Sequence, residues 1–384
     1  MVKKVIIYLS LFVLGFGITF LAVKFAFNQD SPTAEVIKES VGAIGLKQHQ
    51  VIGFMPFWLL DRADKDYSGY LTEMTYFGLT VNPDGTIQKY VKPGEAEPGW
   101  YALTSGKFTP PPNFKMSLAV FNGDPEKINQ LIAEPEAHAA ALAAEVGPMM
   151  EQYGFTTLNL DLESVLDASE SARQNFTAFV RSLKTNLNKP ITIDASPTDL
   201  VKARLIDLAA VGPLVESVIL MTYDYHYSGS LVTGPVAPSF GAGIESEFDV
   251  ETGIQKALEI LPADKIILGV PLYGYEWEML EPGRRSAVLP GSGIVASNRR
   301  VEEFLAGCAS CSAQLETAAQ ESYLVYLDEE TKTYHQIFYP DEKFMKTKIA
   351  LANKYNLGGL AFWALGYEGN SLLNPVAGYQ GALK

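Results

Sequence analysis

Polar side chains alternate with leucines in residues 157–163 (TLNLDLE). Because side chains on a β-strand point alternately to its two faces, Asn159, Asp161 and Glu163 would share one face. Cα atoms two residues apart on a strand lie about 6.6 Å from each other, so both carboxyl groups can reach one substrate atom. Two carboxyl groups this close titrate together, and one keeps its proton to higher pH. The pattern predicts a strand that carries an active site, with Glu163 as general acid. An edge strand with one solvated face is the alternative.

The composition of the chain limits the classes of protein that it can belong to. With 384 residues, 47% of them hydrophobic, it can bury one large core or two ordinary ones. The formal net charge is −14, and no cluster of Lys and Arg interrupts this acidic balance. These features argue against a nucleic-acid-binding surface.

An uncharged run of 19 residues, Val5 to Val23, follows Lys3 and Lys4 near the N-terminus. About 20 apolar residues are enough for a helix to cross a bilayer, and basic residues before the run favour a cytoplasmic N-terminus. We expect residues 1–27 to be a single-pass membrane anchor, residues 28–50 a stalk, and the remainder extracytoplasmic. Secretion after cleavage of a signal peptide is the alternative, but apolar regions of signal peptides are usually about 7–15 residues long.

The two cysteines of the chain, Cys308 and Cys311, are separated by two residues. Outside the cytoplasm we expect them to form a disulfide that closes a small loop. A zinc or redox site is the weaker interpretation, because the sequence has no second cysteine pair and its four histidines are scattered without ligand spacing. We therefore expect no metal site.

From Val51 onward, short apolar runs alternate with longer segments of helical period. The eight predicted strands are 51–57, 74–81, 115–121, 157–163, 191–196, 217–223, 265–271 and 358–364. The predicted helices are 135–153, 169–187, 198–210, 250–261 and 341–355, whereas the Pro- and Gly-rich segment 88–114 is interpreted as a loop. This alternation predicts an α/β fold, a closed (β/α)8 TIM barrel. An open doubly wound sheet is the alternative, but no Gly-rich phosphate-binding turn follows an early strand.

One connection is too long for a simple barrel loop. Between the seventh and eighth predicted strands, residues 322–327 and 333–339 have the pattern of antiparallel strands. We expect a small α+β insertion at 276–340 within a catalytic domain at 51–384. Active sites of such barrels lie at the C-terminal ends of the strands, which is where Asp161 and Glu163 would fall.

Other polar and aromatic residues fall at the same ends of neighbouring predicted strands. They are Met221, Tyr223 and Asp224 after the sixth strand, Tyr273 after the seventh, and the tryptophans Trp58, Trp277 and Trp363. A phenol and a carboxylate can fix an amide carbonyl and a hydroxyl group of a ligand, and aromatic faces suit pyranose rings. For any single aromatic residue, packing in the core of the barrel mouth is the alternative.

In these motifs the chain resembles glycoside hydrolase family 18, the chitinase family, from about Val51 to Glu368. The fourth barrel strand of the family carries Asp-x-x-Asp-x-Asp-x-Glu, and this sequence has Thr156, Asn159, Asp161 and Glu163 at the four places. Thr156 and Asn159 depart from the pattern, which shortens the chain of acids beside Asp161. The catalytic pair itself is intact.

Two further motifs carry the resemblance. The Met-x-Tyr-Asp of the family's sixth strand matches residues 221–224, and the tryptophan that closes its eighth strand matches Trp363. The segments Gly53-Phe54, 81–85 (VNPDG), 234–238 (GPVAP) and 297–300 (SNRR) are similar to a bacterial branch that includes spore-germination and cell-wall glycosidases.

The resemblance implies a retaining glycosidase that cleaves β-1,4 bonds next to N-acetylglucosamine in peptidoglycan or chitin, with the substrate's own acetamide as nucleophile. It implies that Glu163 is the acid and base, that Asp161 orients the acetamide, and that Tyr223 holds the acetamide oxygen. The residues then expected to bind substrate are Asn159, Met221, Asp224, Trp363, Tyr273 and Trp58. No metal or organic cofactor is implied. A non-hydrolytic sugar-binding protein of the cell envelope is the alternative, and the presence of Glu163 counts against it.

Overall fold

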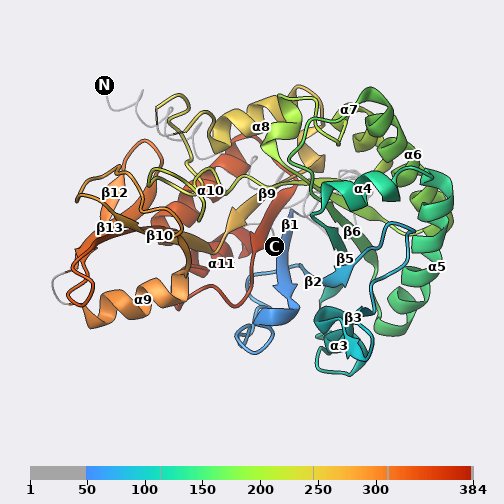
Figure 1. Cartoon of the computed structure of the whole chain (residues 1–384), viewed down its shortest axis with the longest axis horizontal. Helices are drawn as coiled ribbons and strands as arrows, with labels where there is room; N and C mark the ends of the chain where they lie inside the picture. The colour runs from blue at the N-terminus through green and yellow to red at the C-terminus, as the bar shows by residue number, and fades with distance from the viewer. Residues whose placement is uncertain (1–48, 113, 245, 309–310, 382–384) are drawn as a thin grey trace, which may run out of the picture. The chain divides into compact units, whose positions relative to one another are not determined.

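The computed structural model describes residues 49–381 except 113, 245, 309 and 310 (Figure 1). The predicted anchor at 1–27 lies outside these residues, as does the predicted stalk at 28–50 apart from its last two positions. Across the ranges that are described, no helix combines the length and apolar character that a membrane span requires.

Parallel strands form a closed eight-stranded barrel with the order β1-β15-β9-β8-β7-β6-β5-β2. The strands are β1 (Gln50–Pro56), β2 (Glu73–Thr80), β5 (Lys115–Asn122), β6 (Thr157–Leu162), β7 (Ile191–Ala195), β8 (Ser217–Leu220), β9 (Ile266–Pro271) and β15 (Gly359–Trp363). The predicted (β/α)8 barrel is thus confirmed. At its closure Gln50 pairs with Gly359, and a Cβ atom on Gly359 would lie 1.8 Å from the Gln50 carbonyl oxygen, so the two strands can approach only because this residue is glycine.

Helices surround the barrel and bury their apolar faces against it (Figure 1). They include α4 (Pro125–Leu131), α5 (Pro135–Tyr153), α6 (Glu170–Leu187), α7 (Leu208–Val211), α8 (Val250–Leu258), α10 (Glu342–Lys354) and α11 (Asn374–Gly381). In α6 the Ser169 hydroxyl accepts a hydrogen bond from the Ala172 amide at the N-terminus, and Asn188 ends the helix in the left-handed conformation. Its apolar stripe, which includes Phe176, Phe179 and Leu183, is fully buried.

Two connections differ from the sequence-based predictions. The segment interpreted as a loop at 88–114 contains β3 (Tyr90–Lys92), β4 (Glu95–Ala96) and α3 (Pro98–Thr104); the Glu97 side chain caps α3 by accepting from the Trp100 amide. The helix predicted at 198–210 is wrong, since only the 3-10 turn η2 (Pro197–Leu200) and the short α7 form there. Ser196 caps η2 and Asp207 caps α7, so two helix starts lie too close together for one continuous helix.

The long connection between β9 and β15 folds as a separate small sheet. Its five strands have the order β11-β10-β14-β13-β12 and the bounds β10 (Tyr273–Met279), β11 (Ile294–Ser297), β12 (Gln314–Glu316), β13 (Glu321–Leu327) and β14 (Tyr334–Tyr339). The helix α9 (Asn298–Gly307) follows β11, and Cys308 and Cys311 form a disulfide after it. The sheet is antiparallel, as expected for the insertion.

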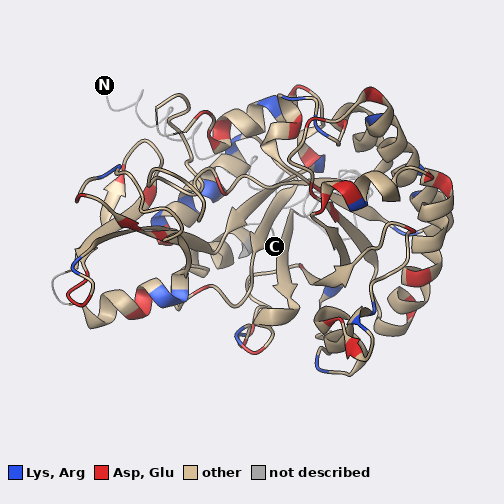
Figure 2. Cartoon of the chain, in the orientation of Figure 1, with Lys and Arg blue, Asp and Glu red and all other residues tan. Residues whose placement is uncertain are grey.

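Charged residues lie both on the outer helices and inside the barrel. In the view of Figure 2, acidic and basic residues are interspersed along the outer helices. Acidic groups also lie inside the barrel: Asp161 and Asp194 are both buried, with 4% of their surface exposed. The barrel therefore holds carboxyl groups in its interior, where ionisation is costly.

Candidate active site

Strand β6 directs its polar side chains into the barrel and its leucines outward. Leu158, Leu160 and Leu162 belong to the main apolar core with residues of the surrounding helices. Asp161 and Glu163 line a cavity at the mouth of the barrel. Glu163 directly follows β6, and its amide donates to the Asn122 carbonyl on the neighbouring strand at 3.0 Å. The predicted division into a polar and an apolar face is confirmed.

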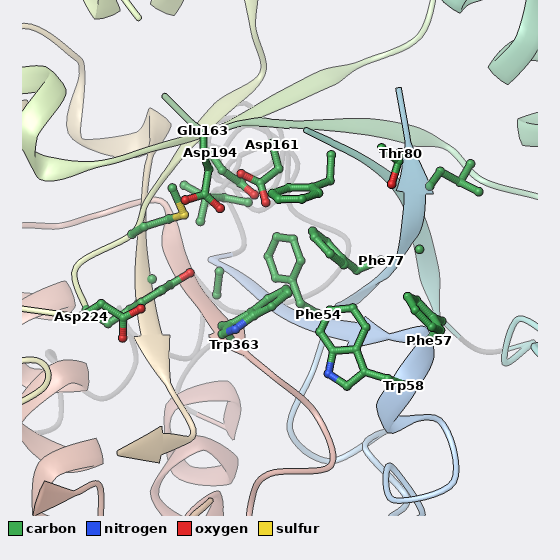
Figure 3. A pocket seen from close by; sticks show the side chains of 18 of the residues that line it. Phe54, Phe57, Trp58, Phe77, Thr80, Asp161, Glu163, Asp194, Asp224 and Trp363 are labelled. Carbon is green, nitrogen blue, oxygen red and sulfur yellow. The ribbon is translucent and has the colours of Figure 1, made fainter. Parts of the chain in front are cut away.

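A single cavity of about 360 Å³ brings the predicted residues together, a size typical of small-molecule sites. Of the residues expected from the sequence, its lining includes Trp58, Asp161, Glu163, Met221, Tyr223, Asp224, Tyr273 and Trp363. Figure 3 shows the carboxyl groups of Asp161, Glu163 and Asp194 gathered on one side and the indole of Trp363 across the cavity from them. The site thus has an acidic wall facing an aromatic one.

The carboxyl groups of the acidic wall have raised pKa values because of burial and of neighbouring negative charges. Burial, then the charges of Asp194 and Glu163, raises the pKa of Asp161 well above its usual value. Burial, then the charge of Asp224, also raises the pKa of Glu163, although this side chain keeps some exposed surface at the cavity mouth. For Asp194, burial is again the main cause, and the pKa is raised to about 8. Asp194 therefore retains its proton at neutral pH, and the raised pKa values of Asp161 and Glu163 favour their protonated forms, as a proton-donating site requires.

Residues after β8 form a second group of polar side chains. Asp224 adopts a left-handed backbone conformation with φ +60°, which is strained for a residue other than glycine and common at functional sites. The Tyr273 hydroxyl donates to Asp224 Oδ1 at 2.6 Å and so fixes this carboxyl group. Burial raises the pKa of Tyr223 well above its usual value. Its phenol therefore remains a neutral hydrogen-bond donor over the usable pH range.

The aromatic wall is centred on Trp363, at the end of β15. Its ring contacts Phe54 and Phe77 at centroid distances of 5.8 and 4.8 Å, which fix the plane of the indole. Trp58 lies 6.2 Å from it and is 48% exposed, so it extends the aromatic surface outward. For Trp277 the alternative of core packing holds: this residue has no exposed surface and packs inside the inserted sheet, with its indole N–H donating to the Tyr227 carbonyl at 3.1 Å.

Asn159 lies deeper in the barrel than the cavity lining and is 1% exposed. Its amide nitrogen donates to Asp194 Oδ1 at 2.8 Å and to Thr192 Oγ1 at 3.1 Å. Asp194 was missed in the sequence, although Thr192 and Asp194 alternate with isoleucines on β7 as Asn159 and Asp161 alternate with leucines on β6. The segment 191–195 thus has the same two-residue period as 157–163, but it contains one acid where 157–163 contains two.

The arrangement suits acid catalysis on a neutral, ring-shaped substrate. It offers protonated and ionised carboxyl groups, a neutral phenol donor and an aromatic floor within one cavity. Among the residues that the structure describes, His, Cys, Asp and Glu form no group of three or more suited to holding a metal ion.

Comparisons with known proteins relate the chain to one family and one fold. The family model of the glycosyl hydrolases family 18 matches residues 70–368. The cortical fragment-lytic enzyme of Bacillus subtilis is 25% identical over 323 residues, which cover 80% of this chain and 67% of that enzyme.

Two solved structures share the fold. The Group IV chitinase of Ostrinia furnacalis, in complex with allosamidin, superposes with a TM-score of 0.71 at 20% identity and covers 88% of this chain and all of that one (100%). The spore cortex-lytic enzyme SleL of Bacillus megaterium has a TM-score of 0.67 at 18% identity, over 85% of this chain and 73% of that one.

Proposed function

Because this chain belongs to the glycosyl hydrolases family 18, we propose that it hydrolyses β-1,4 bonds next to N-acetylglucosamine, with peptidoglycan as its substrate. The observation that carries the proposal is the joint position of Asp161 and Glu163 on one wall of the cavity opposite Trp363. A sugar between these walls would contact the acids on one side and the indole on the other.

Glu163 is proposed to donate a proton to the oxygen of the bond that breaks and later to take one from water. Its raised pKa favours the protonated form that the first step needs. Its position at the cavity mouth, with part of its surface exposed, leaves it accessible to a bond between two sugars. The other two acids of this wall, Asp161 and Asp194, are buried.

Asp161 is proposed to orient the acetamide group of the substrate and to stabilise the positive charge of the oxazolinium intermediate. Its Oδ1 atom is buried and has no hydrogen-bond partner among the residues that the structure describes. A buried acceptor without a partner is costly, and an acetamide N–H from the substrate would satisfy it. The interaction strengthens as charge develops in the transition state, which is what lowers the barrier.

The residues after β8 and at the end of β15 are proposed to hold the sugar in position for this attack. Tyr223 would donate to the acetamide oxygen, and Asp224, held by Tyr273, would bind near the same group. The rigid indole of Trp363 would support the ring from below. Met221 and Trp58 would complete the contacts as lining residues. These groups act by positioning, so their loss should reduce activity less than the loss of Glu163.

Peptidoglycan is favoured over chitin by two considerations. The relative from Bacillus subtilis carries a name that refers to cortical fragments, and the N-terminal sequence carries the features of a membrane anchor. An enzyme tethered outside the membrane by residues 1–27 would have the cell wall within reach. Secretion after signal cleavage would serve the same substrate.

The proposal is tested by incubating the purified full chain with chitin oligomers and with purified peptidoglycan, and by identifying the products by mass spectrometry. We expect peptidoglycan fragments that end in a reducing N-acetylglucosamine. Release of fragments that end in reducing muramic acid, or release of products from chitin oligomers alone, would contradict the proposed bond or the proposed substrate.

A further inference from the structure

The motif at β6 lacks two of its acids, at Thr156 and at Asn159. The pattern that this strand resembles has an acid at the place of Asn159, two residues before Asp161. An amide at this place cannot supply a negative charge or share a proton with Asp161. The chain must therefore keep Asp161 functional in another way.

The neighbouring strand β7 provides a carboxyl group at the same level of the barrel. Asn159 pairs with Thr192 and Leu160 with Ile193, so the next step of this parallel register brings Asp161 beside Asp194. Asp194 is 4% exposed and lines the cavity together with Asp161 and Glu163. Figure 3 shows the Asp194 carboxyl group adjacent to those of Asp161 and Glu163.

Asn159 and Asp194 are directly connected. The Asn159 amide nitrogen donates to Asp194 Oδ1 at 2.8 Å, a short hydrogen bond within the buried interior. An aspartate at position 159 could not donate in this way when ionised. The amide on β6 and the acid on β7 thus form a hydrogen-bonded pair. The carboxyl group that the family pattern places on β6 is here supplied by the neighbouring strand β7.

We propose that Asp194 is a positioning residue for the reaction, which supplies from β7 the carboxyl group that Asn159 does not supply from β6 and orients Asp161 toward the substrate acetamide. This inference rests on the proposed function. It assigns to Asp194 no contact with the bond that breaks.

The charged and titratable groups around Asp194 fit this role. Asp161 faces it from β6, Glu163 from the position directly after β6, and Tyr223 from the segment after β8. On its other side, Asp194 lines a smaller cavity of about 200 Å³ with Glu163, Asp199 and Arg204. Burial, opposed by the Asn159 hydrogen bond and assisted by the charge of Glu163, raises the pKa of Asp194 to about 8. Asp161 and Asp194 together therefore hold a proton at neutral pH.

The test uses two variants. The first removes the carboxyl group from β7, and the second also places a carboxyl group at position 159 on β6. Asp194→Asn keeps the side-chain size and an acceptor for Asn159 but removes the titrating group. We expect kcat to fall about 10- to 100-fold with KM within about threefold, and the pH profile of kcat to shift. In the double variant Asn159→Asp/Asp194→Asn, which reverses the pair, we expect at least about a tenfold recovery of kcat over Asp194→Asn.

A purely structural role for Asp194 predicts a different result, because it requires only the hydrogen bond to Asn159. Asp194→Asn with kcat within about twofold of the wild type and an unchanged pH profile would overturn the proposal. A folded double variant no faster than Asp194→Asn would also overturn it. If Asp194→Asn alone does not fold, the double variant decides: kcat within about tenfold of the wild type supports the proposal, and a larger loss refutes it.

Two controls accompany the series. Asp124→Asn makes the same chemical change at the exposed N-terminus of α4, and should leave kcat unchanged. Glu163→Gln separates this inference from the function on which it rests. Loss of turnover in Glu163→Gln with full turnover in Asp194→Asn would refute the role of Asp194 alone, whereas turnover in both would refute the proposed function.

Discussion

Replacing Asp194 by asparagine should make the protein more stable at alkaline pH even though it slows the reaction. The folded protein raises the pKa of this carboxyl group from 3.8 to about 8, so folding favours its protonated form. A raised folded pKa gives a stabilisation that is fully present below pH 3.8 and is lost as the pH rises through about 8. Asparagine is neutral throughout and does not suffer this loss.

The magnitude follows from the two pKa values. Each pH unit between them corresponds to about 1.36 kcal/mol, so ionisation of Asp194 lowers the free energy of unfolding by up to about 6 kcal/mol. The amide of asparagine brings an extra N–H group into the buried site, which costs about 1–3 kcal/mol if it finds no acceptor. We therefore expect a net stabilisation of about 3–5 kcal/mol at pH 8 and a net destabilisation of about 1–3 kcal/mol at pH 4, where the wild-type carboxyl group is already protonated.

Urea unfolding of the wild type and Asp194→Asn, at pH values from 4 to 8, measures this difference. The stability of the variant relative to the wild type should rise continuously with pH, and the m-value should stay unchanged. Asp124→Asn, which alters an exposed acid, should give a small difference that does not depend on pH in this way. An equal difference at pH 4 and pH 8 for Asp194→Asn would show that the folded protein does not hold a proton on this group.

Three further substitutions test other parts of the account. Asp161→Asn should lower kcat by about 100-fold, the range that loss of one transition-state contact produces, while circular dichroism stays native; unfolding would show instead that Asp161 is structural. Tyr273→Phe removes the hydrogen bond to Asp224 and should raise KM about tenfold in initial-rate assays, whereas an unchanged KM would exclude Asp224 from substrate binding. Lys348→Met leaves the buried Glu321 without its cation and should lower the free energy of unfolding by about 3–5 kcal/mol; a change below about 1 kcal/mol would show that the pair is not coupled.

The barrel could be predicted because its signals are local. Each strand is an apolar run of the length that a buried parallel strand needs, and helices such as α6 carry a capping residue at the start and an apolar stripe. The segment 198–210 could not be predicted in the same way. Its apolar spacing resembles a helix, but the two caps Ser196 and Asp207 divide it, and tertiary packing decides which signal prevails.

Most of the site could also be predicted, because strand ends of a barrel meet at one face. Asp161, Glu163, Tyr223 and Trp363 were found from strand position and motif, and all line one cavity. Trp277 shows the limit of this reasoning: it follows a barrel strand in sequence, but it belongs to the inserted sheet and is buried there. Whether an aromatic residue faces a cavity or a second core depends on packing that its position along the chain does not reveal.

Asp194 was missed for a different reason. A single acid on β7 gives no pattern of its own, and its importance comes from the hydrogen bond to Asn159 on the next strand. Pairing between strands that are 33 positions apart in sequence depends on barrel register, which the sequence does not specify. Side-chain hydrogen bonds between neighbouring strands are therefore the part of the site that could not be predicted from the sequence.

The most direct test of the account is a comparison of the wild type with Glu163→Gln on peptidoglycan fragments, with turnover and binding measured on the same preparations. Glutamine keeps the shape of the side chain but cannot give up a proton. We predict that turnover disappears while the dissociation constant stays within about tenfold. Turnover equal to that of the wild type would contradict the assignment of Glu163 as the proton donor, and with it the reaction proposed for this cavity.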